Sequence, residues 1–216
     1  MNLSKYKKYD ENPKEKSKRT IYERFGICNN DDIIVSVGEL SKRKNHICII
    51  EAMALLKDMN ISYLVCGTGA MEQQLRKKAE ELGVEKQVIF AGYVNDVPDV
   101  LDECDCFVFP SFQEGLPVAV MEAMAVGLPV IASDIRGVRE LVIHAKGGYL
   151  VNGHDSEDYA VKIRRMFTEK YGKSAVPRNE RRRQMGGFNM EHVKKYSIEV
   201  VDKQMRKIYA DLLGGE

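Results

Sequence analysis

The chain has 216 residues, 44 % of them hydrophobic, which is enough to bury one substantial core. Its 33 basic and 32 acidic residues leave a net charge of +1. A nucleic-acid-binding protein normally shows a basic excess, so we expect no nucleic-acid partner. No apolar run approaches the ~20 residues of a membrane-spanning helix, and the N-terminal segment lacks the apolar stretch of a secretory signal. These features predict a cytoplasmic protein.

Alternating strands and helices are predicted from residue 31 onwards, after a charged segment (1–20) without periodicity, which we expect to be a linker or frayed arm. The predicted strands are 33–37, 61–66, 88–91, 106–110, 129–132 and 148–151. The predicted helices are 45–58, 70–82, 97–103, one from Pro117 to Gly127, a turn near Val138, and 155–171. Apolar runs between helices are typical of a parallel sheet covered on both faces. We therefore predict an α/β, Rossmann-like, doubly wound six-stranded sheet of order 3-2-1-4-5-6.

The pattern weakens beyond Gly172. A basic helical stretch at 178–183 is followed by Gly186-Gly187, which predicts a break, and 190–213 reads as one long helix with an apolar side. We divide the chain into a linker or arm (1–30), one α/β domain (31–190) and a C-terminal helix packed on it (191–216). The arginines of the basic stretch favour a solvated helix face; contact with an anionic membrane surface is the alternative.

The cysteines and histidines do not form a metal-binding pattern. The five cysteines are an odd set, four of them in apolar contexts, which favours buried thiols in a reducing compartment. Cys104 and Cys106 could be read as a metal pair, but no second ligand pair follows them, so we interpret them as core thiols. The four histidines are scattered, without the spacing of metal ligands.

The strongest functional pattern lies in residues 104–142. A strand ends in a polar loop, and Glu114 and Glu122 are separated by seven residues, which include a Gly-Leu-Pro turn. A loop and helix start at the end of a buried strand is where open α/β sheets bind ligands. Carboxylates there could accept sugar hydroxyls, while backbone amides at the helix N-terminus face an anion. Those amides belong to Gly115, Leu116 and Val118.

This segment resembles the Glu-x7-Glu signature of family 4 retaining glycosyltransferases (glycosyl transferases group 1), which have the two-domain GT-B fold. The resemblance covers about residues 33–213, the C-terminal half of a family member, of the type that builds capsule, exopolysaccharide or lipopolysaccharide. It implies the domain that binds a UDP- or GDP-linked sugar, for transfer to an acceptor hydroxyl with retention of configuration. It also implies that Glu114, the catalytic candidate, contacts sugar hydroxyls near the reacting carbon and that Glu122 binds the ribose. No cofactor and no metal are expected.

A second segment of this resemblance follows the first predicted strand, at SVGELSKRKNH. Lys44 matches the lysine that contacts the nucleotide diphosphate, and it stands directly before a helix start, where helix amides could also face phosphate. Many family members have an arginine where this chain has Glu39. A carboxylate cannot supply the positive charge with which that arginine binds phosphate. Lys42, Arg43 or a docked partner could supply this charge instead.

Two further segments match positions beside the nucleotide. Gly67 and Gly69 follow the second predicted strand, where a backbone passes the bound nucleotide in the family; a plain strand-to-helix turn is the alternative. Tyr93 and Val94 match the segment whose backbone pairs with the base, although a tyrosine at a strand end often packs against the next helix.

The resemblance covers only the C-terminal half of a family member, and this determines which partners we expect. An N-terminal acceptor domain, or a partner subunit, would have to complete the site, so we expect little or no transferase activity from this chain alone. A subunit of a split transferase and a non-catalytic nucleotide-sugar binder remain alternatives. A nicotinamide oxidoreductase domain is a further alternative, but no G-x-G-x-x-G follows Val37. Peripheral contact with the inner face of the membrane is left open.

Overall fold

The computed structural model describes residues 1–3, 5–6, 19–28, 31–152, 154–168 and 178–213. In this part of the chain, six parallel strands form one sheet of order β3-β2-β1-β4-β5-β6, as predicted. The strands are β1 (Asp32–Val37), β2 (Ile61–Cys66), β3 (Val88–Gly92), β4 (Cys106–Phe109), β5 (Val130–Ser133) and β6 (Gly148–Val151). The order of the strands reverses between β1 and β4, which leaves a crevice at their carboxyl ends.

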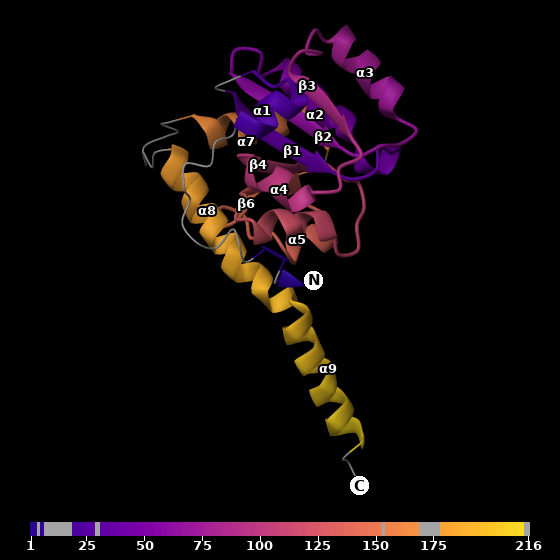
Figure 1. Ribbon diagram of the computed structural model, residues 1–216, viewed down its shortest axis with the longest axis vertical. Helices are drawn as coiled ribbons and strands as arrows, with labels where there is room; N and C mark the ends of the chain where they lie inside the picture. Colours follow the sequence, from indigo (N-terminus) through magenta and orange to yellow (C-terminus); the bar gives the residue numbers. More distant parts are fainter. Residues whose placement is uncertain (4, 7–18, 29–30, 153, 169–177, 214–216) are drawn as a thin grey trace.

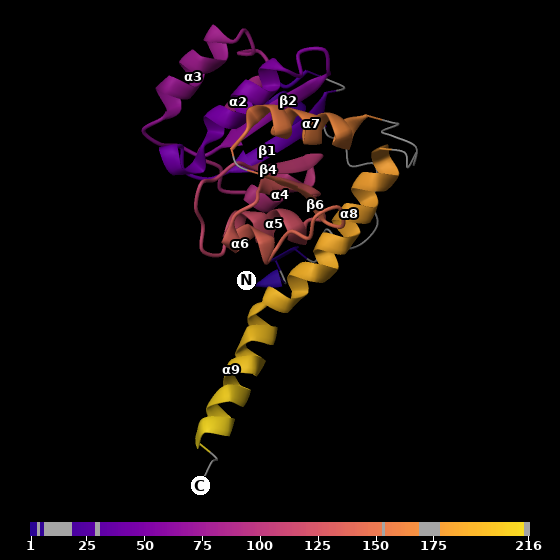
Figure 2. The same cartoon turned by 180° about the vertical axis from the view of Figure 1, so that it is seen from behind.

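Helices cover both faces of this sheet, because its strands carry apolar side chains on both sides. Every residue of β2 is buried, for example. One face is covered by α1 (Arg19–Phe25), α4 (Val97–Asp102), α5 (Val118–Ala125) and α6 (Arg136–Arg139). The other is covered by α2 (His46–Ala54), α3 (Glu72–Glu81) and α7 (Ser156–Phe167). The two views, from opposite sides, show these two layers (Figure 1, Figure 2).

Helix α8 (Arg178–Val193) runs through Gly186-Gly187, so the predicted break there is wrong. The reason is close packing. A Cβ atom on Gly186 would lie 2.0 Å from the carbonyl oxygen of Gly127, so only glycine lets α8 approach the end of α5. Asn189, fully buried one turn later, donates to two backbone carbonyls of the domain. The helix is therefore part of the domain core.

Two arginines of α8 make ion pairs rather than facing solvent. Arg178 lies 2.7 Å from Asp32, and Arg182 lies 3.2 Å from Asp32 and 3.0 Å from Asp105. Asp105 also accepts a hydrogen bond from the Ile33 amide, and its side chain is only 8 % exposed. The predicted solvated face is wrong for these two arginines, which fasten α8 to the amino ends of β1 and β4.

The predicted helix 190–213 is interrupted by η3 (Lys194–Tyr196), and a new helix, α9, spans Ile198–Leu213. The Ser197 hydroxyl accepts a hydrogen bond from the Val200 amide, as an N-cap does. Helix α9 buries no residue and extends away from the domain (Figure 1), so the predicted packing on the domain is wrong for it. Its exposed apolar side chains are Ile198, Val201, Met205, Ile208, Tyr209, Leu212 and Leu213. No described helix is long and apolar enough to cross a membrane.

The N-terminal segment is more structured than the predicted linker wherever the structure describes it; residues 7–18 and 29–30 lie outside the described part. Helix α1 was not predicted, yet Ile21 is buried and its amide donates to Glu103. Tyr6 is also buried, at 6 % exposure. The charged composition of the segment hid these anchors, since the apolar residues that pack on the core are interspersed with charged and polar ones. Helix α7 ends at Phe167, earlier than predicted, because Thr168 is extended; residues 169–171 of the predicted helix lie outside the described part.

Candidate functional site

The predicted functional residues come together at the carboxyl ends of the strands. Lys44 lies in η2 (Lys42–Lys44), shortly after β1, and Glu114 lies in the loop after β4. Strands β1 and β4 pair with each other, although they are far apart in sequence. This is the point where the strand order reverses, which is the usual ligand position in open α/β sheets.

Glu114 is the centre of a charged cluster. Its Oε1 atom lies 2.8 Å from Lys44 Nζ and 2.5 Å from Arg43 Nη1, and it accepts a 2.7 Å hydrogen bond from the Ser111 hydroxyl. Burial raises the pKa of Glu114, but hydrogen bonds from Lys44 and Ser111 and the charges of Lys44 and Arg43 more than offset this and lower it. The carboxylate is therefore ionised at neutral pH, and two cations meet at one of its oxygens.

Lys44 is held in place by its surroundings and is only 14 % exposed. Its ammonium lies 4.8 Å from the centre of the Phe109 ring, within the range of a cation–π contact. A Cβ atom on Gly38 would meet the Lys44 side chain at 3.3 Å, and Gly38 has a φ of 155°. Glycine at this position thus allows the backbone conformation and leaves room for the Lys44 side chain. Of the substitutes left open by the sequence, Arg43 is the one that contacts the cluster.

The loop that enters α5 presents free backbone amides. Helix α5 begins at Val118, one residue later than predicted, with Pro117 at the N-cap. Among the described residues, no partner accepts a hydrogen bond from the amides of Gly115, Leu116 or Val118. These are the donors that an anion at a helix N-terminus uses. The arrangement therefore fits an anionic ligand group.

Glu122 lies half-buried on α5, one turn into the helix. Its Oε1 atom accepts a 2.9 Å hydrogen bond from the Tyr6 hydroxyl, across 116 positions of the chain. No ion pair links Glu122 to a described cation, so its environment differs from that of Glu114. Sequence reasoning missed Tyr6, because nothing in its charged segment marks it.

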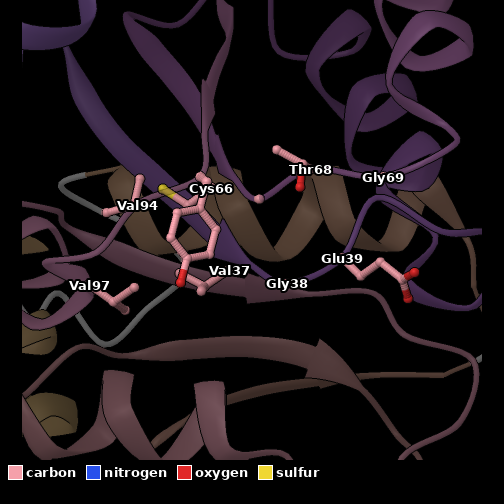
Figure 3. A pocket seen from close by; sticks show the side chains of 10 residues that line it. Val37, Gly38, Glu39, Cys66, Thr68, Gly69, Val94 and Val97 are labelled. Carbon is pink, nitrogen blue, oxygen red and sulfur yellow. The ribbon is translucent and has the colours of Figure 1, made fainter.

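A pocket of about 610 Å³ opens beside this cluster, at the ends of β1, β2 and β3. In Figure 3 the side chains of Cys66, Val94 and Val97 lie toward one end and that of Glu39 toward the other. Burial raises the pKa of the Cys66 thiol to about 12, so this wall is neutral. Four predicted residues line the pocket, namely Gly67, Gly69, Tyr93 and Val94.

Two of these residues have clear structural roles. A Cβ atom on Gly67 would lie 1.9 Å from the carbonyl oxygen of Gly38, and one on Gly69 would lie 2.5 Å from that of Leu40. Both glycines therefore let the loops after β1 and β2 pass each other closely. Tyr93 is 75 % exposed, so it is not packed away against the next helix. Contact of these residues with a nucleotide stays a prediction.

No group of three or more His, Cys, Asp or Glu side chains in the described residues could hold a metal ion. His46 is buried, and its Nδ1 lies 3.0 Å from the Tyr63 hydroxyl. Burial lowers the pKa of His46 to about 4, so the ring is neutral at physiological pH. Cys104 and Cys106 are buried in the core, as expected from the sequence.

Comparison with known proteins identifies the family. The family profile described as Glycosyl transferases group 1 matches residues 17–186. The chain belongs to this family. It is 28 % identical over 194 residues to a galactosyltransferase of Escherichia coli, named UDP-Gal:alpha-D-GlcNAc-diphosphoundecaprenol alpha-1,3-galactosyltransferase. That match covers 88 % of this chain and 48 % of the relative. The chain therefore spans about half the length of that relative.

Solved structures show the same fold. Anabaena HepE, crystallised with UDP and glucose, superimposes with a TM-score of 0.82 at 19 % identity, over 97 % of this chain and 55 % of that one. The C-terminal domain of the group 1 family protein LpcC from Francisella tularensis has a TM-score of 0.75 at 23 % identity. That match covers 92 % of this chain and 99 % of that domain. The chain thus forms one half of a GT-B fold, and the nicotinamide oxidoreductase alternative is wrong.

Proposed function

We propose that this chain is the donor domain of a retaining glycosyltransferase and binds a nucleotide-sugar across the crevice between β1 and β4. The observation that carries this proposal is the convergence of Lys44, Glu114 and the free amides at the start of α5 beside a 610 Å³ pocket. A cation and helix amides suit a diphosphate, carboxylates suit sugar hydroxyls, and the pocket has room for a base.

Each group then has a distinct role. The base lies in the pocket between the Gly67 loop and the backbone of Tyr93 and Val94. Glu122 accepts hydrogen bonds from the ribose hydroxyls. The α5 amides and Lys44 bind the diphosphate, and Glu114 accepts hydrogen bonds from the sugar near the reacting carbon.

Catalysis would rest on positioning and on stabilising the leaving diphosphate. Lys44 and Arg43 place positive charge where the phosphate oxygens gain negative charge as the sugar bond breaks. This charge takes the place of a divalent metal, so we expect binding and transfer without one. No covalent nucleophile is needed in this scheme.

The relatives support a role in surface-polysaccharide synthesis. The Escherichia coli relative is named for a UDP-linked donor, and the HepE structure contains UDP. Because this chain spans about half of that relative, we propose that an N-terminal domain, or a partner subunit, supplies the acceptor side. A split transferase is the second form of this proposal, favoured by the uncovered apolar side chains of α9.

Calorimetric titration with UDP, GDP and ADP, with and without magnesium, tests the proposal. We expect one nucleoside diphosphate to bind without added metal. If none binds at millimolar concentration, with or without magnesium, the proposed function is wrong.

Substitution of Glu122 tests the ribose contact. Glu122→Ala should weaken binding of the nucleotide by about 1.5–3 kcal/mol, the range for hydrogen bonds to a charged group. Glu191→Ala removes an exposed carboxylate and serves as the control. Equal affinities of the two variants would make Glu122 an ordinary surface charge.

Transfer assays test the half-enzyme interpretation. A radiolabelled nucleotide-sugar and a lipid-linked acceptor extract are incubated with the chain, with and without an added N-terminal domain. We expect turnover only with the second domain, because that domain would contribute the acceptor groups and exclude water from the leaving phosphate. Robust turnover by the chain alone would contradict this.

A further inference from the structure

Tyr6 contacts the candidate site from the N-terminal segment, which precedes the alternating strands and helices in the sequence. Its hydroxyl donates a 2.9 Å hydrogen bond to Glu122 Oε1, and the residue is buried, at 6 % exposure, in the core cluster that includes residues of α5. The segment around it has further anchors, because Met1 and Leu3 pack on the same core and the Ile198 amide donates to the Met1 carbonyl at 2.9 Å. The phenol is thus held against α5 by more than its own hydrogen bond.

The bond restrains a side chain that is otherwise free to turn. Glu122 has several staggered rotamers at the surface of a helix, and each would aim its carboxylate differently. A carboxylate can accept about four hydrogen bonds, and Tyr6 occupies one of these positions. Among the described residues, no other donor contacts the Glu122 carboxylate. Most of its acceptor capacity therefore remains open in one fixed orientation.

The two glutamates also have donors of different charge. Glu114 is surrounded by Lys44 and Arg43, which compensate its charge, whereas Tyr6 is a neutral donor. A carboxylate held by a neutral donor keeps its full negative charge for ligand hydroxyls, and such charge-assisted bonds are the stronger ones. The two glutamates thus differ in the chemistry that they offer.

We infer that Tyr6 is a positioning residue, which fixes the Glu122 carboxylate so that its open lone pairs accept both neighbouring hydroxyls of a nucleotide ribose. This inference rests on the proposed function and assigns a ligand-binding role to the N-terminal segment.

The test compares Tyr6→Phe with wild type in calorimetric titrations of UDP and of 2′,3′-dideoxy-UDP. If only one of a few Glu122 rotamers binds ribose, losing the restraint should raise the Kd for UDP about three- to tenfold. The Kd for the dideoxy nucleotide should not change, because it has no hydroxyl for Glu122. In a Glu122→Ala background, which has no side-chain acceptor, Tyr6→Phe should have no further effect. Tyr22→Phe is the matched control, since it removes a hydroxyl that donates at 2.9 Å to the Asp31 carbonyl in the same part of the chain.

The outcomes separate the two proposals. If wild type binds UDP and Tyr6→Phe binds it equally well or more tightly, the positioning role is wrong and the proposed function stands. An equal loss for both nucleotides would assign Tyr6 a purely structural role and also overturn the inference. Absence of nucleotide binding by wild type would overturn the proposed function, and the role of Tyr6 with it.

Discussion

Gly137 offers a way to move the proposed anion-binding loop without touching its residues. It lies in α6, buried beneath the loop that leads into α5. A Cβ atom added there would lie 1.9 Å from the Gly115 carbonyl oxygen and 2.7 Å from that of Glu114. Both contacts are with backbone, which cannot rotate aside as a side chain can. In Gly137→Ala the loop must therefore retreat by about 1 Å, because α6 is anchored by the fully buried Val138 and close-packed interiors leave no spare room.

The magnitude follows from this displacement. Overpacking of this kind typically costs about 1–3 kcal/mol of stability. A shift of the loop by about 1 Å also misplaces the amides of Gly115, Leu116 and Val118, and one lost hydrogen bond to a charged phosphate is worth about 1.5–3 kcal/mol. Since about 1.4 kcal/mol is a factor of ten, the Kd for UDP should rise at least about tenfold.

Urea denaturation and calorimetric titration with UDP measure the two effects in the same preparation. The control is Gly187→Ala on α8, where an added Cβ atom meets nothing within 4 Å. Alanine should stabilise that helix by up to about 1 kcal/mol and leave UDP binding unchanged. Wild-type affinity for UDP in Gly137→Ala, together with the expected loss of stability, would refute the idea that this loop binds the diphosphate.

Three further predictions concern the fold. Burial sets the folded pKa of His46 at about 4, below the unfolded value of about 6.5, so the unfolded state takes up the proton first and stability is lost as pH falls from 6.5 toward 4. Between pH 7 and 5.5, wild type should lose about 1 kcal/mol more stability than His46→Gln in urea denaturation. Parallel curves for wild type and His46→Gln would exclude this linkage. Asp105→Asn breaks a buried ion pair and should lower the free energy of unfolding by about 3 kcal/mol. The exposed Asp202→Asn should cause no measurable change. Equal urea midpoints for the two variants would count against an anchoring role of Asp105. Asn189→Ala removes two buried 2.7 Å hydrogen bonds to backbone carbonyls and should cost about 2 kcal/mol by the same assay; a loss of less than about 0.5 kcal/mol would show that water replaces the amide.

The sheet could be predicted because its strands are short apolar runs buried on both faces, separated by helices of ordinary length. The strand order then follows from the doubly wound topology. Lys44 and Glu114 could be placed at one crevice for the same reason, since the carboxyl ends of β1 and β4 must meet there. The two side chains lie 2.8 Å apart in the structure, and their contact with a nucleotide stays a prediction.

What the sequence did not predict depends on contacts between distant segments. Gly186 looks like a helix breaker, but it sits within a helix because the Gly127 carbonyl approaches it. Arg182 looks like a surface charge until Asp32 and Asp105 are placed beside it. Tyr6 contacts a helix 116 positions away, a distance over which no local pattern carries information.

Under the proposed function, the shared oxygen of Glu114 would link recognition of phosphate to recognition of sugar. Lys44 and Arg43 both contact Glu114 Oε1. A diphosphate that takes Lys44 as its counter-ion must draw it away from this oxygen, and a lone pair of the carboxylate is then released for a sugar hydroxyl. Arrival of the leaving group would in this way prepare the sugar subsite. A free monosaccharide, which brings no phosphate, would meet a carboxylate that is still occupied by its two cations.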